Sequence, residues 1–320
     1  MNIVILGGAG FIGQKLAIKL AEHGFLRDKA IGKITLCDMV EPQNQIQADF
    51  PIQFTQLEMT DEKSVSAAIS DDTDVIFHLA SIVSGQAEAD MQLGYQVNLD
   101  GMLHMLKRIC QLPTPPILVF SSSIAVYSAE TPQPIEDYSI RSPQSSYGTQ
   151  KVICELLLND YSRKGLVDGR GVRLPTITVR PGKPNAAASS FLSSIIREPL
   201  VGEKAICPVT EDYRHYFSSP RTIIKNIIHA AEIDAKDLGD DRNLMLPGIS
   251  ATVNNMLVAL RNVAGDEVAD LVEFKRDETI EKIVLTWVSD LNPERALELG
   301  FYQDKSFEDF IKAHIEDELS

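Results

Sequence analysis

Short apolar segments alternate with longer segments of helical periodicity through the first half of the chain. The apolar segments are rich in β-branched residues and lack polar alternation, which indicates strands buried on both faces. They cover residues 3–6, 34–36, 52–57, 75–79, 117–121 and 174–179. Between them, apolar side chains recur at steps of three and four over residues 13–23, 97–110 and 147–161, as on a buried helix face. The pattern predicts an α/β fold with a doubly wound parallel sheet.

The rhythm changes after residue 180. Residues 185–190 are small and the later elements are less regular. We therefore expect residues 1–180 to form one domain and residues 181–320 a smaller one, with part of 212–250 returning to the sheet. Three helix starts are expected in this half, at Ser219-Pro220, after Ser250 and at Ser306.

The overall charge is acidic, with 45 acidic against 30 basic residues and a net charge of −15. This charge repels phosphate backbones and anionic membranes, so we expect no nucleic-acid or membrane partner. An anionic small substrate then needs local arginines to hold it. The chain starts with no signal-peptide pattern and has no run of 18 apolar residues, which favours a cytoplasmic protein. Its four cysteines and six histidines show no metal-ligand spacing, so no metal site is expected.

Three glycines, Gly7, Gly10 and Gly13, follow the first predicted strand and open the first predicted helix. Glycines at this spacing permit a tight turn and let backbone amides approach a pyrophosphate, which the positive end of the helix attracts. We therefore expect this loop, with Phe11 and Ile12 at the helix start, to bind a dinucleotide. A glycine-rich turn that binds nothing is the alternative.

Asp38 ends the second strand of the predicted sheet. A carboxylate at this point can accept hydrogen bonds from both adenosine ribose hydroxyls and would repel a 2′-phosphate. Residues 39–42 include no Arg or Lys that would neutralise such a phosphate. The sequence therefore favours NAD over NADP, with a simple strand-end turn as the alternative for Asp38.

Tyr147 and Lys151 lie four residues apart, on one face of a predicted helix. The helix follows Ser121, Ser122 and Ser123, which end a predicted strand where ligands bind in such sheets. The lysine and a positive nicotinamide both favour phenolate, so we expect a pKa of Tyr147 lowered toward neutrality, suited to removing a proton from an alcohol. The alternative is a surface tyrosine beside a solvated lysine, with the serines forming a polar loop.

The chain resembles the extended short-chain dehydrogenases/reductases, the NAD-dependent epimerase/dehydratase family. The resemblance covers nearly the whole chain and rests on the glycine run, His78-Leu79-Ala80, Val97-Asn98-Leu-Asp-Gly101, residues 121–127, Tyr147 with Lys151, and Arg180-Pro181. It implies a Rossmann fold that binds NAD, followed by a smaller C-terminal substrate-binding lobe.

The resemblance also implies roles for individual residues. Ser123 becomes the catalytic serine, Tyr147 the base, and Lys151 the ligand of the cofactor ribose. Ser122 is then expected near the nicotinamide, and Asn98 supports the active-site end of its helix. Further implied cofactor contacts are Glu58, Leu79, Ala80 and Pro181, and implied substrate contacts are Ser81, Ser123, Asn185, Ser189, Arg214 and His215.

Two segments depart from the epimerases of this family. Ser128 follows Val126-Tyr127 where a glycine is usual, and Val-Tyr-Gly-Pro is missing after Arg180-Pro181. Residues 180–191 and 211–221 are instead similar to the D-erythronate dehydrogenase branch, which oxidises a four-carbon sugar acid at its 2-hydroxyl to the 2-oxo acid. For Arg214 and Arg221, a bidentate clamp on the substrate carboxylate and ordinary surface ion pairs remain open alternatives, and Lys183 is equally open.

The resemblance thus implies NAD-dependent oxidation of a small anionic sugar acid, D-erythronate to 2-oxo-D-erythronate, with Tyr147 as the general base. Two alternatives remain: a nucleotide-sugar epimerase or dehydratase that keeps NAD tightly bound, and a non-catalytic NAD-binding sensor. Retention of Ser123, Tyr147 and Lys151 together argues against the sensor. A homodimer formed through the helices at 97–110 and 147–161 is also implied.

Overall fold

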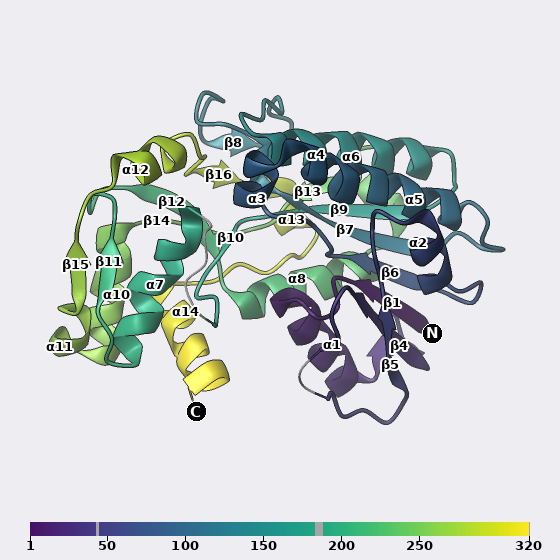
Figure 1. Ribbon diagram of the computed structural model, residues 1–320, viewed down its shortest axis with the longest axis horizontal. Coiled ribbons are helices and arrows are strands. Elements are labelled where there is room, and N and C mark those ends of the chain that lie inside the picture. Colours follow the sequence, from purple (N-terminus) through teal and green to yellow (C-terminus); the bar gives the residue numbers. More distant parts are fainter. Residues whose placement is uncertain (43–44, 183–187, 320) are drawn as a thin grey trace. The chain divides into compact units, whose positions relative to one another are not determined.

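The structure, a computed structural model, describes residues 1–42, 45–182 and 188–319 and divides into two compact units (Figure 1). The first unit comprises Met1–Ser123, Ser145–Arg173 and Ile224–Leu244, and the second comprises Ile124–Gln144, Leu174–Ile223 and Met245–Ser320. Each unit therefore takes segments from both sides of residue 180. The assignment of the cofactor to residues 1–180 and of the substrate to residues 181–320 stays a prediction.

A seven-stranded sheet forms the centre of the first unit. Its strand order is β13-β9-β7-β6-β1-β4-β5, and the neighbouring pairs from β7 to β5 are all parallel. The strands are β1 (Asn2–Leu6), β4 (Lys33–Asp38), β5 (Ile52–Gln56), β6 (Val75–His78), β7 (Ile117–Ser123), β9 (Asp168–Leu174) and β13 (Asn243–Met245). The order reverses between β1 and β6, as in a doubly wound sheet. The predicted Rossmann-type fold class is confirmed.

Helices on one face of this sheet share a core with its strands. Apolar side chains of α2, α5 and α6 pack with Val4, Leu6, Ile76, Leu118 and Phe120 of the strands. The helical elements of this unit are α1 (Phe11–His23), α2 (Glu62–Ala68), α3 (Ser84–Ala89), α4 (Met91–Gly94), the π-helix η1 (Tyr95–Asp100), α5 (Gly101–Ile109), α6 (Ser146–Arg163) and α9 (Ala235–Leu238). A small hairpin is formed by β2 (Phe25–Leu26) and β3 (Lys29–Ala30). The predicted helix at 97–110 is thus a π-helical turn followed by an α-helix.

The strand predicted at residues 174–179 is wrong. The strand that joins the sheet is β9, which ends at Leu174, and after it residues 175–179 contain only the short β10 (Thr176–Ile177), which pairs with β12 in the second unit. Strand β9 contains two glycines and two arginines, so its sequence lacks the apolar run that is typical of a buried strand. Arg170 and Arg173 are nevertheless buried, because Asp168 and Glu155 neutralise them.

The second unit is built on small sheets covered by helices. Its strands are β8 (Ile135–Glu136), β10, β11 (Ala205–Cys207), β12 (Arg214–Ser218), β14 (Ile249–Thr252), β15 (Val272–Phe274) and β16 (Leu291–Asn292). Its helical elements are η2 (Ile124–Val126), η3 (Ala188–Ser190), α7 (Phe191–Leu200), α10 (Val253–Ala264), α11 (Asp266–Ala269), α12 (Glu278–Val284), α13 (Glu294–Glu298), α14 (Phe307–His314) and η4 (Ile315–Leu319). Apolar residues of α7, β12, α10 and α14 form its core.

The three helix starts expected in the second half are confirmed. Helix α8 (Pro220–Glu232), which the two units share, begins after Ser219, whose hydroxyl accepts from the Thr222 amide at 3.2 Å. Thr252 caps α10 in the same way, and Ser306 caps α14. Each hydroxyl satisfies an amide that the first helical turn leaves unpaired. Within the described part of the chain, every helix is too short or too polar to cross a membrane.

Because β9 packs closely against Asn243, we expect a side chain at Gly171 to destabilise the fold. An alanine Cβ there would lie 1.9 Å from Oδ1 of Asn243, a buried amide that hydrogen-bonds Asn159 and Asp241. We expect Gly171→Ala to lower the free energy of unfolding by about 1–3 kcal/mol, measured by urea denaturation. Gly32→Ala is the control, because its Cβ would approach no atom closer than 3.6 Å. Equal stability of the two variants would contradict the packing.

Candidate active site

The predicted cofactor and catalytic residues of the first unit gather at the carboxyl edge of its sheet. Parallel pairing sets Leu6 of β1 beside both Cys37 of β4 and His78 of β6, and sets His78 beside Phe120 of β7. The strand ends therefore meet at one edge. Asp38 and Ser123 are the last residues of β4 and β7, and Gly7 and Leu79 directly follow β1 and β6 there. Ligands bind at this edge in doubly wound sheets.

The glycine loop leaves no room for larger residues. Gly7 has φ +85°, and a Cβ on it would lie 2.7 Å from the Ala80 amide nitrogen. A Cβ on Gly13 would lie 2.2 Å from the Gly7 carbonyl oxygen. The amides of Gly7 and Gly8 both donate to the Cys37 carbonyl, at 2.8 and 3.0 Å. The loop is thus held tightly against the ends of β1 and β4.

Helix α1 begins directly after this loop with its positive end uncapped. Gly10 is the N-cap, no side chain caps the helix, and its first turn contains no acidic residue. The amides of Phe11, Ile12 and Gly13 have no acceptor within the helix, because the first turn always lacks one. A helix end of this kind attracts an anion. The loop and helix start therefore fit the pyrophosphate of a dinucleotide.

Asp38 lies beside the same loop. Its carboxylate accepts from the Ala9 amide at 3.0 Å and from the Met39 amide at 2.8 Å. These bonds fix the group while leaving acceptor sites for other donors. The arrangement fits the predicted hydrogen bonds to ribose hydroxyls. Glu58, also predicted to contact the cofactor, accepts from the amide and hydroxyl of Thr60.

Helix α6 carries Tyr147 and Lys151 against the end of β7. The Tyr147 hydroxyl hydrogen-bonds Ser123 and Ser81. The Lys151 ammonium donates to the Ser121 carbonyl at 2.8 Å and lies 5.4 Å from the centroid of the Tyr147 ring. The side chain of Lys151 is buried, whereas Tyr147 is partly exposed. The predicted group of serine, tyrosine and lysine is therefore assembled in one place.

Burial has the largest effect on the pKa of Tyr147. Burial raises it to about 12, and the hydrogen bonds with Ser123 and Ser81 oppose this rise. Burial also lowers the pKa of Lys151 to about 8, against the opposing effect of Cys154 and Glu155. The expected lowering includes the charge of a bound nicotinamide and stays a prediction; among the protein's own groups, desolvation has the largest effect on the pKa of Tyr147.

Asn98 links several elements behind Tyr147. Its side chain accepts from the Ser81 hydroxyl at 3.0 Å and the Ile82 amide at 2.8 Å, and it donates to Gln150 at 2.7 Å. Asn98 lies in η1, a π-helical turn of the kind that is often found at functional sites. A chain of hydrogen bonds therefore runs from Tyr147 through Ser81 to Asn98 and on to Gln150 of α6.

Two charged residues next to this site were not predicted from the sequence. Glu155 and Arg173 are buried and paired, and Glu155 accepts from the Ser122 hydroxyl at 2.6 Å. The Ser122 hydroxyl is therefore bonded to a side chain, and its expected place near the nicotinamide stays a prediction. One signal in the sequence is the position of Glu155 four residues after Lys151. Arg173 gave no signal, because its strand was placed wrongly.

Ser81 and Ser123 lie in the first unit, and the other predicted substrate residues belong to the second. Asn185, like Lys183, lies outside the described residues. Ser189 accepts from Arg180 at 3.0 Å. Arg221 forms ion pairs with Glu316 and Asp317, as the ion-pair alternative describes.

Arg214 and His215 differ sharply in exposure. The exposed Arg214 guanidinium meets only the Ser250 hydroxyl, at 3.4 Å, and has no carboxylate partner among the described residues. His215 is buried, with Nε2 2.6 Å from the Thr176 hydroxyl and its ring against Tyr213 and Trp287. Burial lowers the pKa of His215 to about 3, so the ring is neutral. The substrate contacts of both residues stay predictions, as does the cofactor contact of Pro181.

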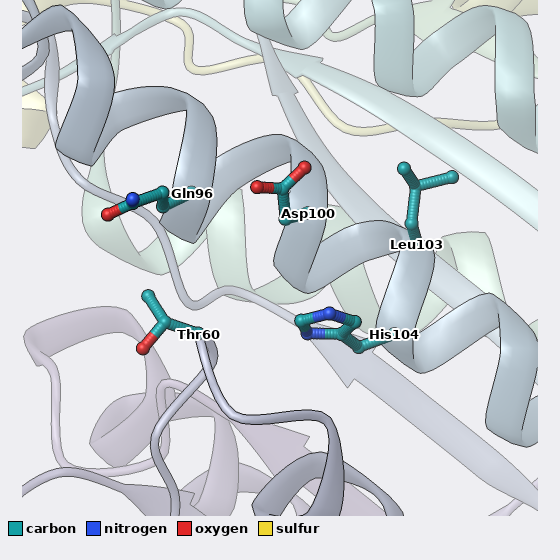
Figure 2. A pocket seen from close by; sticks show the side chains of 5 residues that line it. All are labelled: Thr60, Gln96, Asp100, Leu103 and His104. Atoms are coloured by element: carbon teal, nitrogen blue, oxygen red, sulfur yellow. The ribbon is translucent and has the colours of Figure 1, made fainter.

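Two cavities lie within single units. A cavity of about 430 Å³ in the first unit is lined by Thr60, Gln96, Asp100, Leu103 and His104 (Figure 2). Figure 2 shows Thr60 on a loop, whereas the others follow one run of helix. None of these residues is a predicted site residue. A cavity of about 360 Å³ in the second unit includes Arg214, Tyr213 and Trp287 in its wall.

Comparison with known proteins agrees with this geometry. Residues 3–215 match the model of the NAD dependent epimerase/dehydratase family. The chain belongs to this family. The match includes the glycine loop, Asp38, Ser123, Tyr147 and Lys151.

Relatives extend the similarity over the whole chain. A D-erythronate dehydrogenase of Cupriavidus necator is 48% identical over 99% of this chain and 98% of its own length. A D-erythronate dehydrogenase of Haemophilus influenzae is 44% identical over 99% of both chains. A solved structure described as a nucleoside-diphosphate-sugar epimerase from Agrobacterium tumefaciens has a TM-score of 0.96 and 46% identity, covering 100% of this chain and 94% of its own.

The burial of the Lys151 ammonium should make the free energy of unfolding depend on pH. Its pKa is about 8 in the folded protein and 10.5 ordinarily, so below pH 8 the folded chain carries a desolvated charge. Between pH 8 and 10.5 the unfolded chain binds more protons, and stability due to this group rises with pH. We expect Lys151→Met to stabilise the cofactor-free protein by about 1–3 kcal/mol at pH 7 and by much less near pH 10.

Urea denaturation at the two pH values measures this difference. The exposed Lys63 provides the matched control, and Lys63→Met should change stability by less than about 0.5 kcal/mol at both pH values. A gain from Lys151→Met that is the same at both pH values would show that the lysine charge is not the cause.

Proposed function

We propose that the protein is an NAD-dependent dehydrogenase that oxidises D-erythronate, a small sugar acid, to 2-oxo-D-erythronate. The observation that carries the proposal is the meeting of Ser123, Tyr147 and Lys151 beside the glycine loop at the carboxyl edge of the sheet. Two full-length relatives at 44% and 48% identity, both D-erythronate dehydrogenases, support the choice of substrate.

Each residue of the site has a defined task in this reaction. The first turn of α1 would hold the pyrophosphate of the cofactor, Asp38 would accept from the adenosine ribose, and Lys151 would donate to the second ribose. NAD, when bound, accepts the hydride. Ser123 hydrogen-bonds the substrate hydroxyl, and the Tyr147 phenolate oxygen takes its proton.

The pKa of Tyr147 explains why the base acts only in the complex. At about 12 for the protein's own residues, the phenol stays protonated near neutral pH. Lys151 is cationic below about pH 8, and together with the positive nicotinamide it favours the phenolate. Proton removal is thus coupled to the presence of the oxidised cofactor.

The proposal also includes the cellular location and the oligomeric state of the protein. A cytoplasmic location is part of the proposal, because the reaction needs a supply of soluble NAD. A homodimer through α5 and α6 fits their exposed apolar side chains, among them Leu103 and Leu156. Sedimentation or light scattering of the purified protein tests the dimer.

A nucleotide-sugar epimerase is the second candidate. It is favoured by the solved structure from Agrobacterium tumefaciens, which is 46% identical and described as such an epimerase. The two candidates differ in the fate of NAD, since an epimerase keeps it and a dehydrogenase releases NADH. Stoichiometric NADH formation with a C4 to C6 aldonic acid, and none with a UDP-sugar, supports the dehydrogenase.

Removal of the base tests the catalytic assignment. We expect Tyr147→Phe to lower kcat by roughly 10²- to 10⁴-fold, because a positioned general base contributes that much. The affinity for NAD should stay within about threefold, because the phenol contributes little to the glycine-loop contacts. NADH formation measures kcat and fluorescence titration measures binding. Near-native turnover would rule out Tyr147 as the base, whereas dinucleotide binding without activity in the native protein would favour the sensor.

Loss of the unpaired arginine tests the carboxylate contact. We expect Arg214→Gln to raise KM for the sugar acid by roughly 10- to 100-fold, with a smaller effect on kcat, because a charge-assisted hydrogen bond is lost. Arg221→Gln is the matched control, since its guanidinium is already paired with Glu316 and Asp317. An equal KM for the two variants would exclude Arg214 as the carboxylate ligand.

A further inference from the structure

The buried ion pair between Glu155 and Arg173 has no task in the reaction described so far. We propose that Glu155 and Arg173 are positioning residues, which hold α6 against the ends of β7 and β9 and set the electrostatic field at Tyr147 and Lys151. The inference rests on the proposed dehydrogenase function. Both residues lie in the first unit.

The pair is buried and geometrically complete. The side chains of Glu155 and Arg173 are 0% and 1% exposed. Arg173 Nε donates to Glu155 Oε1 at 2.9 Å, and Nη2 donates to Oε2 at 2.8 Å. Ser122 Oγ also donates to Oε1, at 2.6 Å. One carboxylate therefore joins α6, β7 and β9.

Three consecutive serines join the end of β7 to three successive turns of α6. The Ser123 hydroxyl bonds Tyr147, the Ser121 carbonyl accepts from Lys151, and the Ser122 hydroxyl donates to Glu155. Positions 147, 151 and 155 are spaced by four residues and share one helix face. The Glu155 contact is thus the third of a series whose other two members are catalytic residues.

A gain in folding stability does not explain why a buried ion pair occupies this position. Replacing a buried ion pair with apolar residues of similar volume is often neutral or stabilising, because the pair must first lose its hydration. Directional bonds, by contrast, fix the distance and rotation of α6 relative to β7. A shift of about 1 Å in a reacting group can reduce turnover about 100-fold. The geometry therefore has a clearer catalytic use than a stabilising one.

The pair also balances the charge near Lys151. Around the ammonium, His78 of β6 is neutral because burial, and then Lys151 itself, lowers its pKa to about 3. The Cys154 thiol is neutral because burial raises its pKa to about 12. The remaining charges in the described contacts are the Glu155 carboxylate, the Arg173 guanidinium and Asp241, which interacts electrostatically with Arg173. Loss of the Glu155 carboxylate alone makes the field at Lys151 more positive, because Glu155 favours the charged form of that lysine.

Glu155→Gln tests whether the charge of Glu155 affects the protonation of Tyr147 and Lys151. A more positive field favours both the phenolate of Tyr147 and the neutral amine of Lys151. Both limbs of the kcat–pH profile should therefore move to lower pH, by about one pH unit. In the cofactor-free variant, the rise in stability with pH that is due to Lys151 should also begin about one pH unit lower. An unchanged profile with an unchanged stability curve overturns the electrostatic part.

The neutral double variant, Glu155→Gln with Arg173→Gln, tests positioning separately. It removes both charges of the pair, so its pH profile should lie closer to the native one than the profile of Glu155→Gln does. It also weakens the bonds that fix α6, so kcat should stay reduced by about 10-fold. If Glu155→Gln does not fold, kcat of the double variant alone tests positioning. Native kcat in the double variant overturns the positioning part, and a pH shift as large as that of Glu155→Gln overturns the electrostatic part.

Arg170 supplies the matched control. It is buried on the same strand as Arg173, and it pairs with Asp168 and donates to the Ile233 carbonyl at 2.7 Å, without contact to the serines. Arg170→Gln should lower stability and leave the pH profile unchanged. A native protein with no activity on sugar acids would contradict the proposed function itself. An active native protein whose Glu155 and double variants keep its profile and kcat contradicts only this inference.

Discussion

The ammonium of Lys151 must be buried at the carboxyl end of β7, and much of the first unit follows from that constraint. A charge with 2% exposure needs an acceptor and polarisable neighbours, which the Ser121 carbonyl and the rings of Phe120 and Tyr147 provide. These contacts fix the register of α6 along β7. Tyr147, one turn earlier, is thereby brought to Ser123.

The carboxyl edge of the sheet presents positive groups, although the chain as a whole is negatively charged. With a net charge of −15, the protein repels anions at a distance, yet the proposed cofactor and substrate are both anionic. The edge offers them the uncapped start of α1, whose first turn lacks acidic residues, and the cation of Lys151. Asp38 is an acidic residue at this edge. The amides of Ala9 and Met39 donate to its carboxylate and so reduce its repulsion of the pyrophosphate. Short-range donors therefore outweigh the long-range field, which salt screens.

Sequence patterns revealed those parts of the fold that depend on local spacing. Gly7, Gly10 and Gly13 were visible by their spacing, and at Gly7 and Gly13 the close approach of the backbone leaves no room for a side chain. Tyr147 and Lys151 were visible because they lie one helical turn apart. Strand β9 was missed because Arg170 and Arg173 look solvent-exposed until their partners are known. The partner of Arg173 is 18 residues away, and no local pattern reports such a pairing. The raised pKa of Tyr147 was missed for a related reason, since burial is a property of the whole fold.

The pleat of β7 shows how one further contact could have been deduced. Side chains alternate between the faces of a strand, so Leu118, Phe120 and Ser122 share one face. Leu118 and Phe120 pack in the core with Cys154 and Leu158 of α6. Ser122 therefore also faces that helix, and its hydroxyl needs a polar partner there because it is 1% exposed. Glu155 is the residue of α6 that supplies it. A buried serine at the end of an apolar strand face thus predicts a polar residue on the covering helix, and a buried carboxylate in turn requires a cation, which β9 provides.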